Sequence, residues 1–303
     1  METRTLGNTG LEVSVIGFGA MTLGGIFGPV DDAESNRALH AAIDSGINFI
    51  DSSDAYGAGH SENVIGKFLK ERSDRDKIIV GTKGGNDMKT GKRVFTPEYI
   101  RGCVEASLKR LDVEAFDVYL LHNPNVQNMT AEDSYALLDD FKAQGKIKHW
   151  GVSVNTVEEC ELAASSNRPA IMQMEYNVLE QEPSGSFDKA KGAGVGVISR
   201  VPLKRGFLSG RFEENHEFVE GDRRSGILSP ENVRKFQARL DTLKEVANEA
   251  GCDPAAAAIR FCVSHPSVAT VIPGIRTPEQ SKANAAASEP LPQELLDKLR
   301  ALA

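Results

Sequence analysis

The 303-residue sequence lacks the features that mark membrane-bound, secreted and metal-binding proteins. It has no run of about 18 apolar residues that could span a bilayer, and its first residues, METRTLGNTGLEVS, lack the apolar core of a signal peptide. Its four cysteines form no C-x-x-C pair and no cysteine–histidine cluster with zinc spacing. Scattered free thiols suit a reducing compartment, so these absences predict a soluble cytoplasmic protein without a metal site.

The sequence also has little positive charge for its length. Its 35 Lys and Arg residues are outnumbered by 43 Asp and Glu residues, which gives a formal net charge of −8. A phosphate backbone repels an acidic chain, so we expect no nucleic-acid partner. Because 40% of the residues are hydrophobic and no linker or shift in composition divides the chain, we predict a single domain over residues 1–303 with a large core.

Short β-branched runs alternate with longer amphipathic segments along most of the chain. Several of the short runs are apolar almost throughout, as is typical of parallel strands covered on both faces. Eight such strand-then-helix units over about 250 residues predict a (β/α)8 TIM barrel of the α/β class. The predicted strands are 14–21, 48–54, 77–83, 117–123, 148–154, 170–177, 194–203 and 268–274. The predicted helices of these units are 32–45, 61–70, 97–111, 132–144, 156–165, 184–192, 254–264 and 278–287.

Four segments are expected to lie outside the eight units. Residues 3–14 predict an N-terminal β-hairpin with its turn at 7–10. Extra C-terminal helices are expected near 231–250 and 291–301. Residues 204–229 form a long charged loop, and a loop of that length in a compact domain is usually functional.

A doubly wound dinucleotide-binding sheet is the rival architecture, because Gly17-Phe18-Gly19 follows a strand-like run. The dinucleotide fingerprint requires a strand, a tight turn and then a helix. Its third position is Thr22 here, and the residues that follow, LGGIFGPV, have no helical pattern. We therefore favour the barrel.

Four chemically active side chains lie at the ends of three neighbouring predicted strands. The second strand ends with Asp51 and leads into Tyr56, the third ends with Lys83, and the fourth ends with His122. Catalytic groups of a TIM barrel lie at the carboxyl ends of its strands. Each residue alone has an ordinary explanation: a capping aspartate, an exposed tyrosine, a surface lysine and a satisfied core histidine. A buried lysine and a buried carboxylate are costly unless they pair, so the four together predict one catalytic site.

The chemistry of these groups suggests a proton donor. A free tyrosine has a pKa near 10, and a neighbouring ammonium lowers it. We expect Lys83 to have this effect on Tyr56 and Asp51 to hold Lys83 charged and in place. His122 would orient the substrate oxygen toward the phenol. The result would be an acid that protonates an oxygen on which negative charge develops.

Ten motifs in the order of the chain resemble the aldo-keto reductase superfamily, and most closely its bacterial and plant branch related to potassium-channel β subunits and aldose dehydrogenases. The resemblance extends from about residue 3 to residue 288. The first five motifs are RTLGxTGLxVS (4–14), GFGAM (17–21), FIDSSDAYG (49–57), SENxIG (61–66) and TKG (82–84). The others are DVYLLH (117–122), GKIKxWGVS (145–153), QxxYN (173–177), PLxxGFLSG (202–210) and VIPGxRxxxQxxxN (271–284).

The resemblance implies an NADP(H)-dependent oxidoreductase that reduces an aldehyde or ketone to an alcohol, or oxidises an alcohol or aldose in reverse. It implies NADPH/NADP as cofactor and a small carbonyl or sugar compound as substrate, with NADH and an oligomeric state left open. It places the catalytic tetrad on Asp51, Tyr56, Lys83 and His122. The cofactor-binding residues it implies are Met21, Thr22, Asp51, Ser153, Gln173, Arg200, Pro202, Leu203, Gly206, Leu208, Gly210, Arg211, Gly274, Arg276, Gln280 and Asn284.

The adenosine end of that cofactor has a physical interpretation of its own. Arg276, Gln280 and Asn284 are spaced by four residues and are expected to share one helix face. Thr277-Pro278 is typical of an N-cap followed by proline at the first helical position. The helix N-terminus and Arg276 would form an anion site for a 2′-phosphate, which favours NADPH over NADH.

The chain departs from the family pattern at two positions. Asn155 lies one residue later than the Ser-Asn pair of many relatives, which puts its role in doubt. Arg200 occupies a position where relatives often stack an aromatic ring on the nicotinamide. Because a guanidinium repels the cationic oxidised ring, we hypothesise that Arg200 favours the reduced cofactor.

Two other functions are kept as alternatives. Lys83 would be the Schiff-base lysine of a barrel aldolase, if its amine were desolvated or flanked by a cation. The second alternative is a cofactor-sensing regulatory subunit with little turnover, as the resemblance to channel subunits suggests. The substrate pocket is expected to be walled by Phe27, residues 86–88, residues 123–124 and the 204–229 loop.

Overall fold

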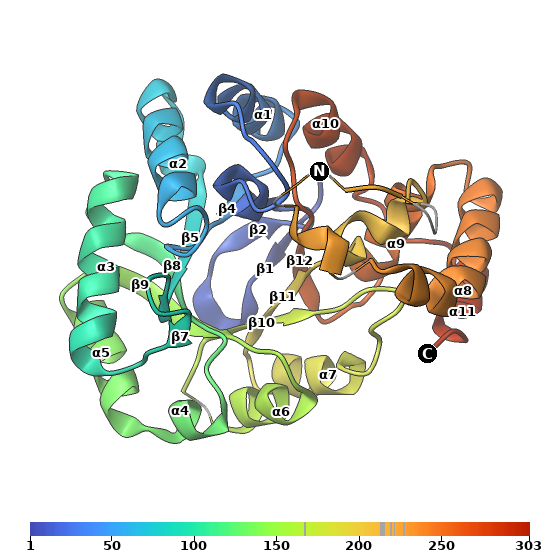
Figure 1. Cartoon of the computed structure of the whole chain (residues 1–303). Helices are drawn as coiled ribbons and strands as arrows, with labels where there is room; N and C mark the ends of the chain where they lie inside the picture. The colour runs from blue at the N-terminus through green and yellow to red at the C-terminus, as the bar shows by residue number, and fades with distance from the viewer. Residues whose placement is uncertain (167, 213–215, 219, 221, 227) are drawn as a thin grey trace.

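A computed structural model describes the chain except for residues 167, 213–215, 219, 221 and 227. Eight parallel strands form a nearly closed barrel with helices around it (Figure 1), which confirms the predicted (β/α)8 fold. The parallel bridges Ile16–Val271 and Gly19–Gly274 join the first strand to the last. In sheet order the strands are β3 (Phe18–Gly19), β4 (Phe49–Asp51), β5 (Ile79–Gly84), β8 (Phe116–His122), β9 (Ile147–Ser153), β10 (Ile171–Glu175), β11 (Gly196–Arg200) and β12 (Val268–Ile272).

Each predicted helix of the eight units is present within one residue of its expected ends. The N-caps predicted for two of these helices are present as side-chain hydrogen bonds. The Thr96 hydroxyl accepts from the Tyr99 backbone amide, and the Thr277 hydroxyl accepts from the Gln280 backbone amide. These helices are α1 (Asp32–Asp44), α2 (His60–Glu71), α3 (Pro97–Leu111), α5 (Glu132–Ala143), α6 (Val157–Ser165), α7 (Ser184–Gly192), α9 (Pro254–Val263) and α10 (Pro278–Ala286). The two expected additions are α8 (Pro230–Glu249) and α11 (Gln293–Arg300), and a short helix that was not predicted is α4 (Val126–Thr130).

The first barrel strand is shorter than the predicted run of 14–21. After β3 the chain leaves the barrel wall as the 3-10 helix η2 (Ala20–Gly24) and crosses toward the loop that follows β4. The crossing is close, because a Cβ at Gly24 would lie 2.5 Å from the backbone nitrogen of Gly57. Glycine at position 24 therefore lets η2 pack directly against the backbone beside Tyr56.

The predicted N-terminal hairpin is formed by β1 (Thr3–Thr5) and β2 (Glu12–Ser14). It lies against the amino ends of the last strands, where the Arg4 guanidinium donates to the Val268 carbonyl over 2.8 Å and the Asn8 amide donates to the Gly194 carbonyl over 2.8 Å. The hairpin thus covers the amino end of the barrel, while the carboxyl ends of the strands remain available for a site.

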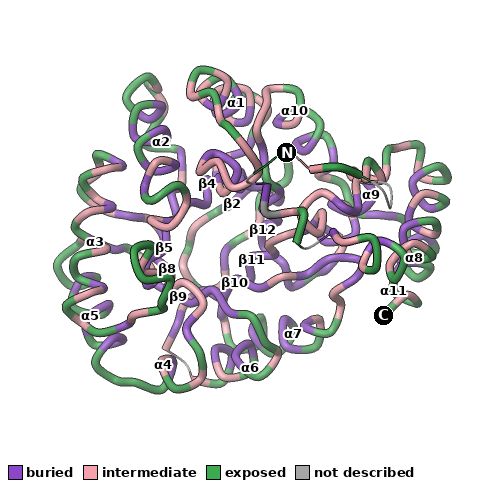
Figure 2. The backbone as a smooth tube through the Cα atoms, in the orientation of Figure 1, coloured by how far each residue is buried: buried purple, intermediate pink, exposed green. Residues whose placement is uncertain are grey.

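Buried apolar residues form two layers on either side of the strands. Val118 and Leu120 of β8 belong to an inner cluster, whereas Tyr119 and Leu121 belong to the outer one, because successive side chains of a strand point to opposite faces. Figure 2 shows that the strands and the inward faces of the helices are buried while the outward helix faces are exposed. The inner cluster consists of Leu6, Val13, Phe49, Val118, Leu120, Ile171, Ile198, Ala269 and Ile272.

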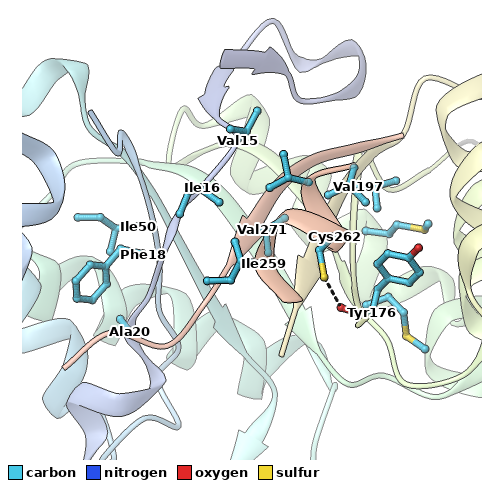
Figure 3. Packing of buried hydrophobic residues seen from close by; sticks show 14 of the residues in the cluster. Val15, Ile16, Phe18, Ala20, Ile50, Tyr176, Val197, Ile259, Cys262 and Val271 are labelled. Carbon is cyan, nitrogen blue, oxygen red and sulfur yellow. Dashed lines mark hydrogen bonds between the residues drawn. The ribbon is translucent and has the colours of Figure 1, made fainter. Parts of the chain in front are cut away.

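The outer layer continues between the last strands and the helices that cover them (Figure 3). Val197 and Val271 from neighbouring strands pack there with Ile259 of α9. The buried Cys262 thiol donates to the Tyr176 carbonyl over 3.2 Å. Among the described residues, no helix is both long and apolar enough to cross a bilayer.

Candidate active site

A cavity of about 550 Å³ opens at the carboxyl ends of the barrel strands. Its volume is in the range of small-molecule and cofactor sites. Tyr56 and His122 line the cavity on one side, and Gln280 and Asn284 of α10 line it on another. Because β8 and β12 lie four strands apart in an eight-stranded barrel, the cavity extends across the whole mouth.

Lys83 and Asp51 form a buried ion pair beneath the cavity. The Lys83 ammonium donates to Asp51 Oδ2 and to the Ser52 carbonyl, each over 2.6 Å, and its side chain is fully buried. Burial alone would lower the pKa of Lys83, but Asp51 and Tyr56 outweigh that effect and raise the pKa above its ordinary value. Lys83 is therefore a charged ammonium that acts through its neighbours, and it does not itself line the cavity.

The Tyr56 phenol lies between this ion pair and the cavity. Its oxygen accepts a hydrogen bond from Lys83 Nζ over 3.4 Å, which leaves its own proton free to be donated into the cavity. Burial raises the pKa of Tyr56 above 10, and the opposing charges of Lys83 and Arg200 do not offset this rise. The expectation of a lowered pKa was thus wrong for the protein without ligands, because desolvation of the phenolate outweighs the nearby ammonium. The phenol is fully protonated near neutral pH.

His122 lies beside the phenol with the two rings edge to face and their centroids 5.9 Å apart. Burial, followed by the charges of Lys83, Arg200 and Arg93, holds the pKa of His122 well below its ordinary value, so the ring is neutral. Its Nδ1 lies 2.9 Å from Ser53 Oγ. When Ser53 donates to Nδ1, the ring proton is on Nε2, and His122 can donate a hydrogen bond.

The wall next to the ion pair is formed by Gln173 at the end of β10. Its Nε2 donates to Asp51 Oδ1 over 2.8 Å, and its Oε1 accepts from Ser153 Oγ over 3.3 Å. Gln173 lines the cavity, but Ser153 is buried behind it and does not. The structure therefore places Ser153 in a supporting position behind Gln173, whereas direct cofactor contact was predicted.

Arg200 at the end of β11 also lines the cavity. Its Nη2 donates to the Val154 carbonyl over 2.9 Å and to Asn155 Oδ1 over 3.0 Å, and its Nη1 lies 3.6 Å from Glu175 Oε2. Its Nε is buried without a partner among the described residues. Asn155, which the sequence left in doubt, lines the cavity and holds this guanidinium in place.

The chain turns sharply where it leaves β11. Val201, Lys204 and Arg205 have φ values of 58°, 44° and 56°, in a region that a β-branched residue such as valine rarely adopts. Strain of this kind persists at sites where surrounding contacts compensate for it. Here Asn177 Nδ2 donates to the Val201 carbonyl over 3.1 Å, and the Lys204 ammonium lies 2.8 Å from Glu175 Oε1.

Most residues predicted for this segment and for the first and last strands reach the cavity. Two do not: Leu208 is fully buried in the outer core, and Gly210 ends the 3-10 helix η4 (Lys204–Ser209) away from the lining. Leu208 and Gly210 therefore lie behind the cavity wall, and a contact of either residue with a cofactor stays a prediction. The predicted residues that do line it here are Met21, Thr22, Pro202, Leu203, Gly206, Arg211 and Gly274.

The segment at α10 differs in one respect from the prediction. Arg276 lies two residues before the helix begins, so only Gln280 and Asn284 share a helix face, although all three line the cavity. The Arg276 guanidinium donates to the carbonyls of Phe27 and Pro29 over 3.1 and 2.7 Å. These bonds hold the loop after β3 against α10 and leave other N–H groups of the guanidinium available.

Arg93 and Asp253 line the cavity and were missed in the sequence, whereas Arg224 belongs to the 204–229 loop that was expected to wall the pocket. Arg224 lines the cavity with its guanidinium over the ring of Phe27, 4.8 Å from the centroid, and it pairs with Asp222. Asp253 caps α9, whose first residues Ala255 and Ala256 also line the cavity. The Asp253-Pro254 cap resembles the two predicted caps and is a signal that could have found this wall. Of the expected pocket walls, Phe27, Asn123 and residues of the 204–229 loop line the cavity, whereas Pro124 and residues 86–88 do not.

The cavity is strongly basic although the chain is acidic. Among the residues that the structure describes, two carboxylates line it, Asp51 and Asp253, and the first of these is neutralised by Lys83. No group of three potential metal ligands occurs among the residues that the structure describes. The arginines that line the cavity are Arg93, Arg200, Arg205, Arg211, Arg224 and Arg276.

Comparison with known proteins adds to this geometry. A model of the aldo/keto reductase family matches residues 15–303. The chain is 30% identical to aldo-keto reductase YhdN of Bacillus subtilis, over 93% of this chain and 87% of that protein. It is 29% identical to aldo-keto reductase yakc [NADP(+)] of Schizosaccharomyces pombe, over 90% of this chain and 83% of that protein. The solved structure of glycerol dehydrogenase AKR11B4 from Gluconobacter oxydans superposes with a TM-score of 0.85 at 29% identity, over 99% of this chain and 94% of that one.

Proposed function

The chain belongs to the aldo/keto reductase family, and on that premise we propose that it reduces an aldehyde or ketone to an alcohol with NADPH, or catalyses the reverse oxidation. One observation carries the proposal. A protonated phenol, Tyr56, faces the cavity with its oxygen 3.4 Å from the ammonium of Lys83. That arrangement supplies a proton to a carbonyl oxygen and stabilises the phenolate that remains.

The cavity suits a dinucleotide that carries phosphate groups. Six arginines line it in a chain whose net charge is −8, and the N-termini of α9 and α10 both face it. Helix N-termini and arginines bind phosphates through backbone amides and charge. We place the adenosine end at Arg276, Gln280 and Asn284, where the free N–H groups of Arg276 would bind a 2′-phosphate and favour NADPH.

The nicotinamide end would lie beside Gln173 and Arg200, next to Tyr56. The bound cofactor supplies the hydride that reduces the carbonyl carbon. Tyr56 gives its proton to the carbonyl oxygen, and Lys83 stabilises the phenolate through their hydrogen bond. Asp51 holds the ammonium in place, and the neutral His122 donates a second hydrogen bond that orients the oxygen. Effects of about a hundredfold to about ten-thousandfold on the rate are typical of such proton donors.

The raised pKa of Tyr56 bears on the direction of the reaction. Burial keeps the phenol protonated, so the protein without ligands is prepared to donate a proton, as carbonyl reduction requires. Alcohol oxidation requires the phenolate instead, and its rate should rise with pH. The family includes oxidising relatives, of which glycerol dehydrogenase AKR11B4 is named for that activity.

The Schiff-base alternative fits the site poorly. A nucleophilic lysine must be neutral, and the pKa of Lys83 is held above its ordinary value by Asp51 and Tyr56 against the effect of burial. Its ammonium is also fully buried and bonded to three oxygens. Attack on a carbonyl in the cavity would require all three bonds to break.

A panel of aldehydes, ketones and sugars tests the proposal, with NADPH consumption followed by absorbance, the reverse reaction run with NADP, and NADH as the control cofactor. We expect turnover of at least one carbonyl class, faster with NADPH than with NADH. Tight NADPH binding without turnover across the panel would contradict the proposal and support the cofactor-sensing alternative.

A further inference from the structure

Two polar side chains on the β8 side of the cavity, the exposed Arg93 and the half-buried Asn123, have no partner among the residues that the structure describes. Arg93 and Asn123 line the cavity next to His122, and neither side chain makes a hydrogen bond or ion pair with any residue that the structure describes. Their positions are fixed by the backbone. Asn123 has φ = 60° directly after β8, and its backbone N–H donates to the Ser153 carbonyl over 2.8 Å.

Arg93 projects from a small hairpin of β6 (Asn86–Asp87) and β7 (Lys92–Arg93) that follows β5. The carboxylate nearest along this hairpin, Asp87, is occupied by the Lys89 amide and the Thr90 hydroxyl over 2.9 and 2.7 Å. Arg93 is close enough to His122 that its charge contributes to the lowered pKa of that ring. An uncompensated guanidinium thus lies within electrostatic reach of the atoms that would hold the carbonyl oxygen.

The phosphates of a cofactor do not account for this charge. The helix N-termini that face the cavity belong to α9 and α10, which flank β12, and β8 lies four strands from β12 in the barrel. Four of the other five cavity arginines come from the segments after β11 and β12. Arg93 and Asn123 therefore belong to the side of the mouth that remains for substrate.

We propose that Arg93 and Asn123 bind an anionic group of the substrate, so that this chain prefers carbonyl compounds carrying a carboxylate or phosphate over neutral ones. The inference rests on the proposed function and narrows its substrate class. A guanidinium binds either anion through paired N–H groups, and the Asn123 amide adds one donor. His122 and Tyr56 would hold the carbonyl oxygen of the same molecule.

Matched pairs of substrates test the inference at saturating NADPH. One pair is 4-oxobutanoate and its methyl ester, and the other is glyceraldehyde 3-phosphate and glyceraldehyde. We expect kcat/KM to be about tenfold or more higher for the anionic member of at least one pair. The pair that shows the preference identifies the anion as carboxylate or phosphate.

The variant Arg93→Gln should lower kcat/KM for the preferred anion about tenfold, mainly through KM, and change the neutral member less than about twofold; tenfold corresponds to about 1.4 kcal/mol. Lys92→Gln is the matched control, because Lys92 has the same charge on the same hairpin but does not line the cavity. It should leave both members unchanged.

Two results would overturn the inference in different ways. Equal kcat/KM for both members of each pair in the wild type, or equal losses on both in Arg93→Gln, would show that Arg93 does not recognise an anion, while the proposed function would stand. No NADPH-dependent turnover of any of the four compounds or of the wider panel would remove the proposed function, and the inference with it.

Discussion

The two sides of the cavity are built by different means. The side at β4, β5 and β8 consists of residues on or just after strands, and its central ion pair is fully hydrogen-bonded over 2.6 Å. The side at β11 and α10 consists of a loop with left-handed residues, helix N-termini and arginines. Strand ends give fixed positions to groups that handle a proton, whereas loops and helix ends surround a large anionic ligand. We propose that the first side carries out the proton chemistry and binds the substrate, whereas the second side binds the cofactor.

The largest effect that would sharpen this comparison is expected from Lys83→Met. Removing the ammonium raises the pKa of Tyr56 further and leaves Asp51 buried without its ion-pair partner, so kcat for carbonyl reduction should fall about a hundredfold or more. The rise of the alcohol-oxidation rate with pH should occur at a higher pH in this variant than in the wild type. NADPH affinity, measured by fluorescence titration, should change less than about threefold, because we propose that the cofactor's phosphates bind on the other side.

Lys77→Met serves as the control for that variant, because Lys77 lies exposed near the amino end of the same strand. It should retain the wild-type rate. A Lys83→Met protein that stays folded by circular dichroism and keeps kcat within a factor of about three would contradict the assignment of proton chemistry to the side at β4, β5 and β8.

A smaller effect, on cofactor affinity and not on the catalytic rate, is expected from Arg276→Gln on the side at β11 and α10. Loss of the guanidinium should weaken NADPH binding about tenfold and leave NADH binding within about twofold, since only NADPH carries the 2′-phosphate. Lys282→Gln removes the same charge from an exposed position of α10 that does not line the cavity. Equal losses for NADPH and NADH in Arg276→Gln would show that Arg276 only holds the loop at Phe27 and Pro29.

The smallest effect is expected where the two sides meet, at Arg200. Its charge lies beside the proposed nicotinamide position and close enough to Tyr56 to oppose the rise in that pKa. In Arg200→Tyr, the affinity for NADP relative to NADPH should rise severalfold, because the cationic ring is no longer repelled. Titration of both cofactors measures the ratio, and an unchanged ratio would dismiss the hypothesis.

The two sides also differ in how well the sequence predicts them. Asp51, Lys83 and His122 could be placed from alternating strands and helices, because parallel strands bring their carboxyl ends to one rim. Arg93 could not be placed at all, and Arg205 and Arg224 were expected only as members of the 204–229 loop. The position of a loop side chain depends on tertiary contacts such as the stacking of Arg224 on Phe27.

Two further outcomes depend on packing that no local pattern records. Leu208 packs in the outer core, and Ser153 lies behind Gln173, to which it donates a hydrogen bond. The pKa of Tyr56 depends on a balance between burial and charge, and burial prevails. The fold was therefore predictable to within a few residues, whereas the positions of individual loop side chains were not.

The most direct test of the whole account is the single-turnover rate of carbonyl reduction by Tyr56→Phe with NADPH already bound. The substitution removes only the hydroxyl that would donate the proton, so NADPH affinity should match the wild type while the rate falls about a hundredfold or more. A variant that binds NADPH normally and keeps more than about a tenth of the wild-type rate, a barrier change below about 1.4 kcal/mol, would contradict the role given to Tyr56.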